Sequence, residues 1–197
     1  MPNDTLPDLI NQFAYYKLLG EKALAQIPDD KLNWRYNLTC NSAATIVKHL
    51  WGNMLSRWTN FLTTDGEKEW RDREAEFDND GWSRDELLHR WNEGWNVLLG
   101  TLRNLKEEDL TKTIYIRNQG HSVREAINRQ LAHYPYHIGQ IVLLGKMLAT
   151  EWTSLSIPKG ASRQFNLAKF AQPKHTEHYT DEFLKTSAQT QMNDDDA

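Results

Sequence analysis

The stretch that decides the fold of this 197-residue chain reads Leu131-Ala-His-Tyr-Pro-Tyr-His-Ile-Gly-Gln-Ile-Val-Leu-Leu144. Its apolar residues recur at steps of three and four, which is the period of an α-helix. His133 and His137 therefore lie one turn apart on one helical face, where both imidazoles can reach a common ion. Pro135 between them removes one backbone hydrogen bond and predicts a kink or a local bulge.

The helix that contains this stretch is predicted to run from Val123 to about Ala149. Ser122 and Glu125 form a capping pair at its start. Ahead of it, Thr113–Ile116 predicts a short strand with a turn at Asn118-Gln-Gly120. One stripe of the helix is predicted to face the interior of a bundle and consists of Ala126, Gln130, His133, His137, Gln140, Leu144 and Leu148.

Three further helices are predicted upstream, from about Leu6 to Gln26, from Asn41 or Ser42 to about Leu62, and from Arg84 to about Leu105. Thr5 with Asp8 and Ser83 with Glu86 are capping pairs for the first and the third. Leu and Trp residues form an apolar seam along the third helix. The four segments together predict an all-α four-helix bundle.

The connection between the second and third helices, Thr63–Trp82, is long and strongly charged. Bundle loops usually have about 2–8 residues. A connection of about 20 residues is long enough to cross over, so that the two helices it joins run parallel. We interpret it as a solvated loop that is pinned by Trp70, Phe77 and Trp82.

The second predicted helix supplies a third histidine. His49, Asn53 and Arg57 recur every four residues beside its apolar face, as a solvated flank or as one wall of a site. In the second case His49 completes a three-nitrogen metal site with His133 and His137 that leaves positions open for water or substrate. Zinc, nickel and ferrous iron all suit such a site, and the spacing does not choose among them.

The neighbours of these histidines bear on the chemistry. An open divalent ion can make hydroxide from water or thiolate from a thiol. A metalloprotease places a Glu next to the first helical histidine as its general base, whereas Tyr134, Pro135 and Tyr136 separate the two histidines here. Peptide hydrolysis is therefore disfavoured. The residues predicted to contact a substrate or to support the ligands are Asn53, Arg57, Tyr136 and Gln140.

Composition excludes several classes of function. The formal net charge is −4 and no basic stripe is present, which argues against nucleic-acid binding. The longest apolar run, Ile141–Leu144, is far below the roughly 20 residues of a membrane span. A single cysteine, Cys40, and the lack of an N-terminal signal predict a cytoplasmic protein.

The chain is predicted to form one domain over residues 1–170, followed by a polar tail over residues 171–197. The segment from Trp152 to Asn166 is predicted to be an ordered loop that covers one end of the bundle. Within the tail, one short helix is predicted around Asp181 to Lys185.

Three stretches resemble the DinB-like (YfiT-like) superfamily of four-helix metalloproteins, in a branch without an assigned activity. They are Ile46–Trp58 around His49, the charged Thr64–Lys68, and His133–Gln140, and the resemblance covers most of residues 5–166. It implies an up-down-down-up helix order, a nickel or zinc ion on the three histidines, and a homodimer.

The resemblance also implies an activity. The superfamily includes bacillithiol S-transferases and a mycothiol-dependent maleylpyruvate isomerase, so it implies a thiol S-transferase that activates a low-molecular-weight thiol for attack on an electrophile. The candidate anchors for an anionic thiol are Arg57, Arg129, Lys159 and Arg163. The alternative is a non-catalytic, metal-stabilised bundle that acts as a binding or stress-related interaction module.

Overall fold

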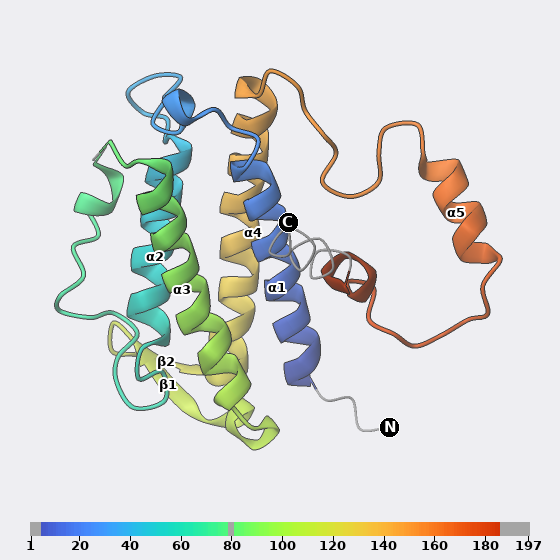
Figure 1. Cartoon of the computed structure of the whole chain (residues 1–197). Coiled ribbons are helices and arrows are strands. Elements are labelled where there is room, and N and C mark those ends of the chain that lie inside the picture. Colours follow the sequence, from blue (N-terminus) through green and yellow to red (C-terminus); the bar gives the residue numbers. More distant parts are fainter. Residues whose placement is uncertain (1–4, 79–80, 186–197) are drawn as a thin grey trace.

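Four long helices form the body of the protein in the computed structural model, which describes residues 5–78 and 81–185. They are α1 (Thr5–Leu24), α2 (Ala43–Trp58), α3 (Arg84–Asn104) and α4 (Val123–Leu148). In Figure 1, α1 rises, α2 and α3 both descend, and α4 rises again. The prediction of an all-α, up-down-down-up four-helix bundle is confirmed.

Shorter elements connect the four helices or follow them. They are η1 (Asp29–Lys31), η2 (Ala75–Phe77), η3 (Glu107–Thr111), β1 (Thr113–Ile116), β2 (Gln119–Ser122) and α5 (Ser162–Phe170).

Serine caps begin three of the long helices. The side chains of Ser42, Ser83 and Ser122 each accept a hydrogen bond from the backbone N–H three residues later, which satisfies a donor that the first helical turn leaves free. Thr5 was wrongly predicted as a cap, because it is the first residue of α1 itself. The backbone N–H of Leu6 instead donates to Glu107 Oε1 at 2.8 Å.

The helix α2 ends at Trp58, four residues earlier than predicted. The chain then turns at Asn60, whose φ of 51° lies in the left-handed region that Asn tolerates better than most residues. This turn starts the crossover, residues 59–83, which leads from the end of α2 back to the level at which α2 began (Figure 1). It is this return that makes α2 and α3 parallel.

The strands β1 and β2 form an antiparallel hairpin below the bundle. Its turn consists of Arg117 and Asn118, both with positive φ, as in the two-residue turns that suit the twist of a hairpin. The predicted turn at residues 118–120 was displaced by one residue, because Gly120 pairs with Tyr115 inside the hairpin. Asp65 of the crossover accepts the backbone N–H groups of Arg117 and Asn118, each at 2.8 Å. The hairpin and the crossover are thus tied together.

Aromatic side chains fill the centre of the bundle. Phe13, Trp58, Trp95 and Tyr134 are at most 1% exposed, and Tyr134 packs against both Phe13 and Trp95. The polar ends of these rings are paired inside the core, since Trp58 Nε1 donates to Tyr134 Oη and Tyr134 Oη donates to Asn53 Oδ1, both at 3.0 Å.

The inner face of α4 is rotated from the predicted stripe. Tyr134, Ile138 and Ile141 point into the core, while His133 is only partly buried. The helix α4 runs without a break through Pro135, and a kink at this residue stays a prediction. The histidines therefore lie at the edge of the core, where they can meet both buried groups and solvent.

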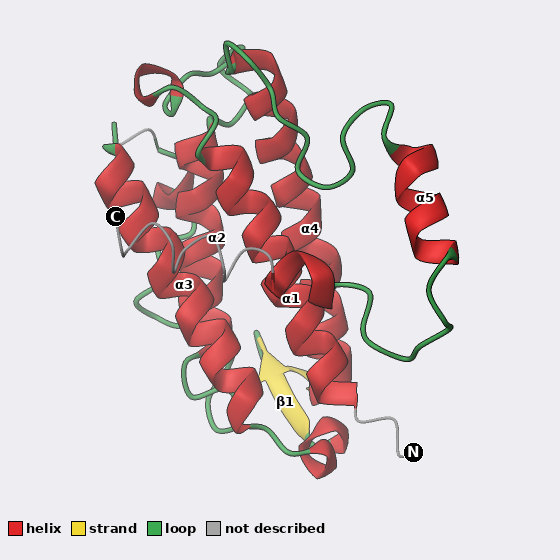
Figure 2. Cartoon of the chain, turned by 45° about the vertical axis from the view of Figure 1, so that its right-hand side comes forward, coloured by secondary structure: helices red, strands yellow, loops and turns green. Residues whose placement is uncertain are grey.

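The predicted loop over one end of the bundle was right only in its first part. Residues 152–161 contain no helix or strand, and Thr153 exchanges hydrogen bonds with Gln26 just after α1. Residues 162–170 instead form α5, none of whose residues is buried, and this helix stands away from the bundle in both views (Figures 1 and 2). Residues 181–185 are helical, as predicted. Tyr179 and Phe183 return to α1, where their rings pack against Tyr15.

The division of the chain into one domain over residues 1–170 and a polar tail from residue 171 stays a prediction. Among the described residues, no helix is both long and apolar enough to cross a membrane.

The close approach of α1 and α3 yields a test of the packing. A Cβ added to Gly20 would lie 2.4 Å from Trp91 Cη2, and Trp91 is buried. We expect Gly20→Ala to lower the free energy of unfolding by about 1–3 kcal/mol, measured by urea denaturation, because the buried indole has to shift.

The matched control is Gly100→Ala on α3, where an added Cβ would meet no atom within 4 Å. This variant should be up to about 1 kcal/mol more stable than wild type, because Ala favours a helix over Gly. Equal effects of the two substitutions would contradict the packing of α1 on α3.

Candidate metal centre

Three histidines from two helices meet at one point. The helix α2 supplies His49, and α4 supplies His133 and His137 one turn apart. The Nε2 atom of His133 lies 3.3 Å from Nε2 of His49 and 3.1 Å from Nε2 of His137. His49, which is at least 84 positions away from the other two histidines in the chain, thus turns the same ring nitrogen toward their common centre.

The other ring nitrogen of each histidine donates a hydrogen bond outward. The acceptors are Glu76 Oε2 at 2.8 Å from His49, Gln130 Oε1 at 3.1 Å from His133 and Gln140 Oε1 at 3.1 Å from His137. Carboxylate and amide oxygens accept only, so each Nδ1 must carry the hydrogen. In a neutral imidazole this leaves the Nε2 lone pair free, and all three lone pairs face the common centre.

The spacing of these nitrogens fits a metal ion. Tetrahedral bonds of about 2.0–2.1 Å from zinc to nitrogen place the ligand atoms about 3.3–3.4 Å apart. The two measured separations, 3.3 Å and 3.1 Å, are close to that value, and the ligand atoms of all three histidines lie within 4.8 Å of one another. The group could therefore bind a divalent ion with little movement.

Burial keeps two of the ligands neutral. It lowers the pKa of His133 to about 3, with smaller contributions from His137, His49 and the nearby arginines. It also lowers the pKa of His137 to about 4, with a further contribution from His49. Both rings are therefore unprotonated near pH 7, as metal ligands must be.

Glu76 in η2 is the residue that sequence reasoning missed. It is 5% exposed, and Arg71 donates to both of its oxygens, from Nε at 2.7 Å and from Nη2 at 2.9 Å. Although burial acts to raise the pKa of Glu76, hydrogen bonds from His49 and Arg71 hold it below its ordinary value. The Glu76 carboxylate is thus ionised and fixes the tautomer of His49.

A glycine makes room for this carboxylate. A Cβ on Gly52 would lie 2.3 Å from Glu76 Oε1, so only glycine lets the crossover lie this close to α2. Phe77, next to Glu76, stacks on the His49 ring with centroids 5.0 Å apart. The interpretation of the crossover as a solvated loop pinned by aromatics was therefore right only in part. Most of its described residues are exposed or half-buried, and Phe77 and Trp82 pack inward, whereas Glu76 is buried and Trp70 is exposed. A glycine three residues after His49 within a helix was the available sequence signal.

A pocket of about 410 Å³ opens beside the three histidines. Asn53, Arg57 and Tyr136 line it, as does Arg129, whereas Lys159 and Arg163 do not. Gln140 is not part of this lining but supports His137 from behind. The arginines that sequence reasoning did not select are Arg71, Arg73 and Arg117.

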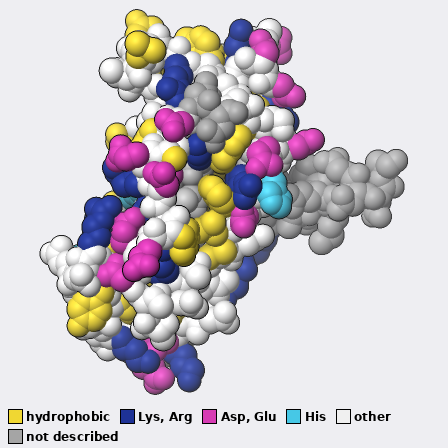
Figure 3. All heavy atoms as spheres, turned by 90° about the vertical axis from the view of Figure 1, so that its left-hand side faces the viewer, with side chains coloured by type: hydrophobic (Ala, Val, Ile, Leu, Met, Phe, Trp, Pro, Cys, Tyr) yellow, Lys and Arg dark blue, Asp and Glu magenta, His cyan; other side chains and the backbone are white. Residues whose placement is uncertain are grey.

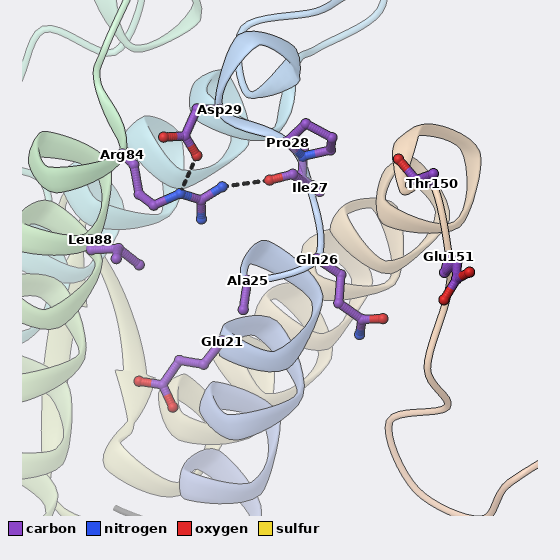
Figure 4. Close-up of a pocket in the computed structure, with 10 residues that line it drawn as sticks. All are labelled: Glu21, Ala25, Gln26, Ile27, Pro28, Asp29, Arg84, Leu88, Thr150 and Glu151. Atoms are coloured by element: carbon purple, nitrogen blue, oxygen red, sulfur yellow. Dashed lines mark hydrogen bonds and ion pairs between the residues drawn. The ribbon is translucent and has the colours of Figure 1, made fainter. Parts of the chain in front are cut away.

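A second hollow, of about 540 Å³, lies between the end of α1 and the neighbouring parts of α3 and α4 (Figure 4). Among its charged lining residues, Arg84 donates to the backbone oxygens of Leu24 and Ile27 and pairs with Asp29. Leu24 is the last residue of α1 and Ile27 lies three residues beyond it, so Arg84 fastens α3 to the chain that leaves α1. The arginine therefore has a structural role, and this hollow contains no group of metal ligands.

Comparisons with known proteins agree with this fold. Residues 1–161 match a family described as "Protein of unknown function (DUF1572)". No curated protein matches the chain. Among solved structures, the chain is similar to the crystal structure of a DinB-like protein, YjoA, from Bacillus subtilis, with 17% identity and a TM-score of 0.51 over 75% of this chain and 96% of the other.

At 17% identity the similarity to YjoA concerns the fold, whereas the family match covers most of the chain. The chain therefore belongs to the DUF1572 family, which has no assigned activity, and it has the DinB-like fold that its sequence resembles.

Proposed function

We propose that this protein binds a divalent metal ion through His49, His133 and His137 and activates a low-molecular-weight thiol for attack on an electrophile, as a thiol S-transferase. Support for the metal comes from the three Nε2 atoms that converge at 3.1–3.3 Å. Zinc and nickel are the favoured ions and ferrous iron is also suited, because all three accept neutral nitrogen ligands.

The pocket beside the three histidines has no carboxylate in its wall, because none of the residues that line it is an Asp or a Glu. The nearest carboxylate that contacts a ligand, Glu76, is occupied by His49 and Arg71. A metalloprotease employs a carboxylate beside its ligands as general base, whereas a thiol bound to a divalent ion loses its proton through coordination itself. The site therefore favours thiol activation over peptide hydrolysis.

The chain's own residues would hold and orient the reactants. Asn53 uses its Oδ1 to accept from Tyr134, and its amide N–H groups make no hydrogen bond with the described residues, so they are free for a ligand in the pocket. Tyr136 stands at the rim and is 63% exposed, where its hydroxyl can reach an entering molecule. The predicted homodimer and cytoplasmic location stay predictions.

Metal binding is the first test. We expect the untagged protein, stripped with a chelator and incubated with zinc or nickel, to hold one ion per chain by elemental analysis. His133→Ala should retain less than a tenth of that, because it removes the nitrogen that lies between the other two. At a hundredfold excess of free metal over Kd, the ion should stabilise the wild type by about 2.7 kcal/mol.

The matched control is His89→Ala, which makes the same chemical change at an exposed position on α3 and should leave the metal content unchanged. A wild-type protein that takes up no stoichiometric zinc or nickel would remove the basis of the proposal.

The second test separates an enzyme from a structural site. We expect the cobalt-substituted protein to develop a near-ultraviolet sulfur-to-cobalt absorption band when it is titrated with a small thiol, because three protein ligands leave a position open. Cys40→Ser should behave like wild type, which shows that the band does not come from the chain's own thiol. An unchanged spectrum would favour the alternative, a non-catalytic bundle in which the metal only joins α2 to α4.

A further inference from the structure

Guanidinium groups dominate the wall of the histidine pocket. They belong to Arg57, Arg71, Arg73, Arg117 and Arg129. The whole chain has a formal net charge of −4, so a pocket with five arginines and no acidic lining residue differs from the rest of the molecule. A concentration of one charge in a concave site attracts ligands of the opposite charge.

The carboxylates in contact with these arginines do not neutralise them. Glu67 is shared by three guanidinium groups, those of Arg57 and Arg117 at 3.1 Å and that of Arg71 at 3.4 Å. Glu76 pairs with Arg71. Four of the guanidinium groups, those of Arg57, Arg71, Arg73 and Arg117, thus share Glu67, Glu76 and the largely exposed Glu74, which lies 3.5 Å from Arg73. The arginines of the pocket wall therefore outnumber the carboxylates that form ion pairs with them.

Two of the arginines have N–H donors that no described group pairs. Arg57 is 6% exposed, and its Nε is buried without a hydrogen-bond partner. Buried donors are rarely left unpaired, because losing water without a replacement partner is costly. Arg129 makes no ion pair or hydrogen bond with the described residues, although it lines the same pocket. A fork of N–H donors of this kind matches the oxygens of a carboxylate or a phosphate.

The position of Arg117 is set by the fold. It occupies the hairpin turn with a φ of 55°, and Asp65 of the crossover accepts its backbone N–H. The hairpin therefore adds a guanidinium to those that α2, the crossover and α4 bring to the pocket. The fixed backbone at this turn holds the start of the Arg117 side chain in place, and Glu67 pairs with its guanidinium at 3.1 Å.

The size and surroundings of the pocket favour a small molecule over a nucleic acid. A volume of about 410 Å³ is in the range of small-ligand sites. Outside the pocket, on the face that Figure 3 shows, Lys and Arg side chains are interspersed with Asp and Glu and form no broad basic surface. A nucleic-acid site would instead extend a basic stripe across the surface.

We propose that the pocket beside the three histidines binds small acidic molecules that carry a carboxylate or a phosphate group, held by Arg57, Arg117 and Arg129. This names the substrate class of the site and rests on the proposed function only in placing the anion beside the reacting thiol. The thiol, the electrophile or both would carry the acidic group.

The test measures anion binding by the full-length, metal-free protein in Tris chloride buffer, so its outcome does not depend on metal binding. Succinate and inorganic phosphate are titrated calorimetrically, with neutral succinamide as the control ligand. We expect at least one of the two anions to bind and succinamide not to bind. Tighter succinate binding would identify a carboxylate site, and tighter phosphate binding a phosphate site.

The variants test the arginines. The double substitution R117Q/R129Q should weaken anion binding about tenfold or more, because each charge-assisted pair contributes strongly. Both side chains are exposed, so the fold should persist, which the unfolding temperature checks. R103Q on α3 makes the same change at an exposed position outside the pocket and should bind like wild type.

Three results would overturn the proposal. They are an absence of binding by both anions at millimolar concentration, equal affinities of R117Q/R129Q and wild type, and an oligonucleotide that binds more tightly than either small anion. Loss of the proposed thiol chemistry would leave the anion titrations unchanged, so the two proposals fail separately.

Discussion

The site depends on the outward hydrogen bonds of three imidazoles. Glu76, Gln130 and Gln140 each take the Nδ1 hydrogen of one histidine, so three Nε2 lone pairs face one another at contacts of 3.1 and 3.3 Å. Lone pairs at this distance repel unless a cation lies between them. A divalent ion turns the repulsion into coordination, and it would link α2 to α4 at the edge of the core.

The crossover connects this local chemistry to the topology. Parallel packing of α2 and α3 requires a long return segment, and that segment carries Glu76 to His49 and Glu67 to the arginines of the pocket. Asp65 fastens the same segment to the hairpin turn. The feature that sets the helix order therefore also supplies the groups that orient a ligand and charge the pocket. Gly52 permits the contact, because any larger side chain would displace the Glu76 carboxylate.

The sequence predicted the parts that depend on local periodicity. Helix-period spacing located the four helices, with serine caps marking the starts of α3 and α4, and the four-residue spacings on α2 and α4 selected His49, His133 and His137. Glu76 was missed because its position depends on hydrogen bonds with Arg71 and His49 across an irregular segment, which no periodicity reports. The stripe on α4 was displaced because Tyr134, with its hydroxyl paired to Asn53 and Trp58, takes the central core position.

The most direct measurement of the central claim is X-ray absorption spectroscopy of the zinc-loaded protein. The account predicts three imidazole nitrogens at about 2.0–2.1 Å and one or more additional light-atom ligands from solvent. Addition of a small thiol should replace a light-atom ligand by one sulfur at about 2.3 Å. A zinc ion bound by fewer than three imidazoles, or one whose first shell does not change with the thiol, would contradict it.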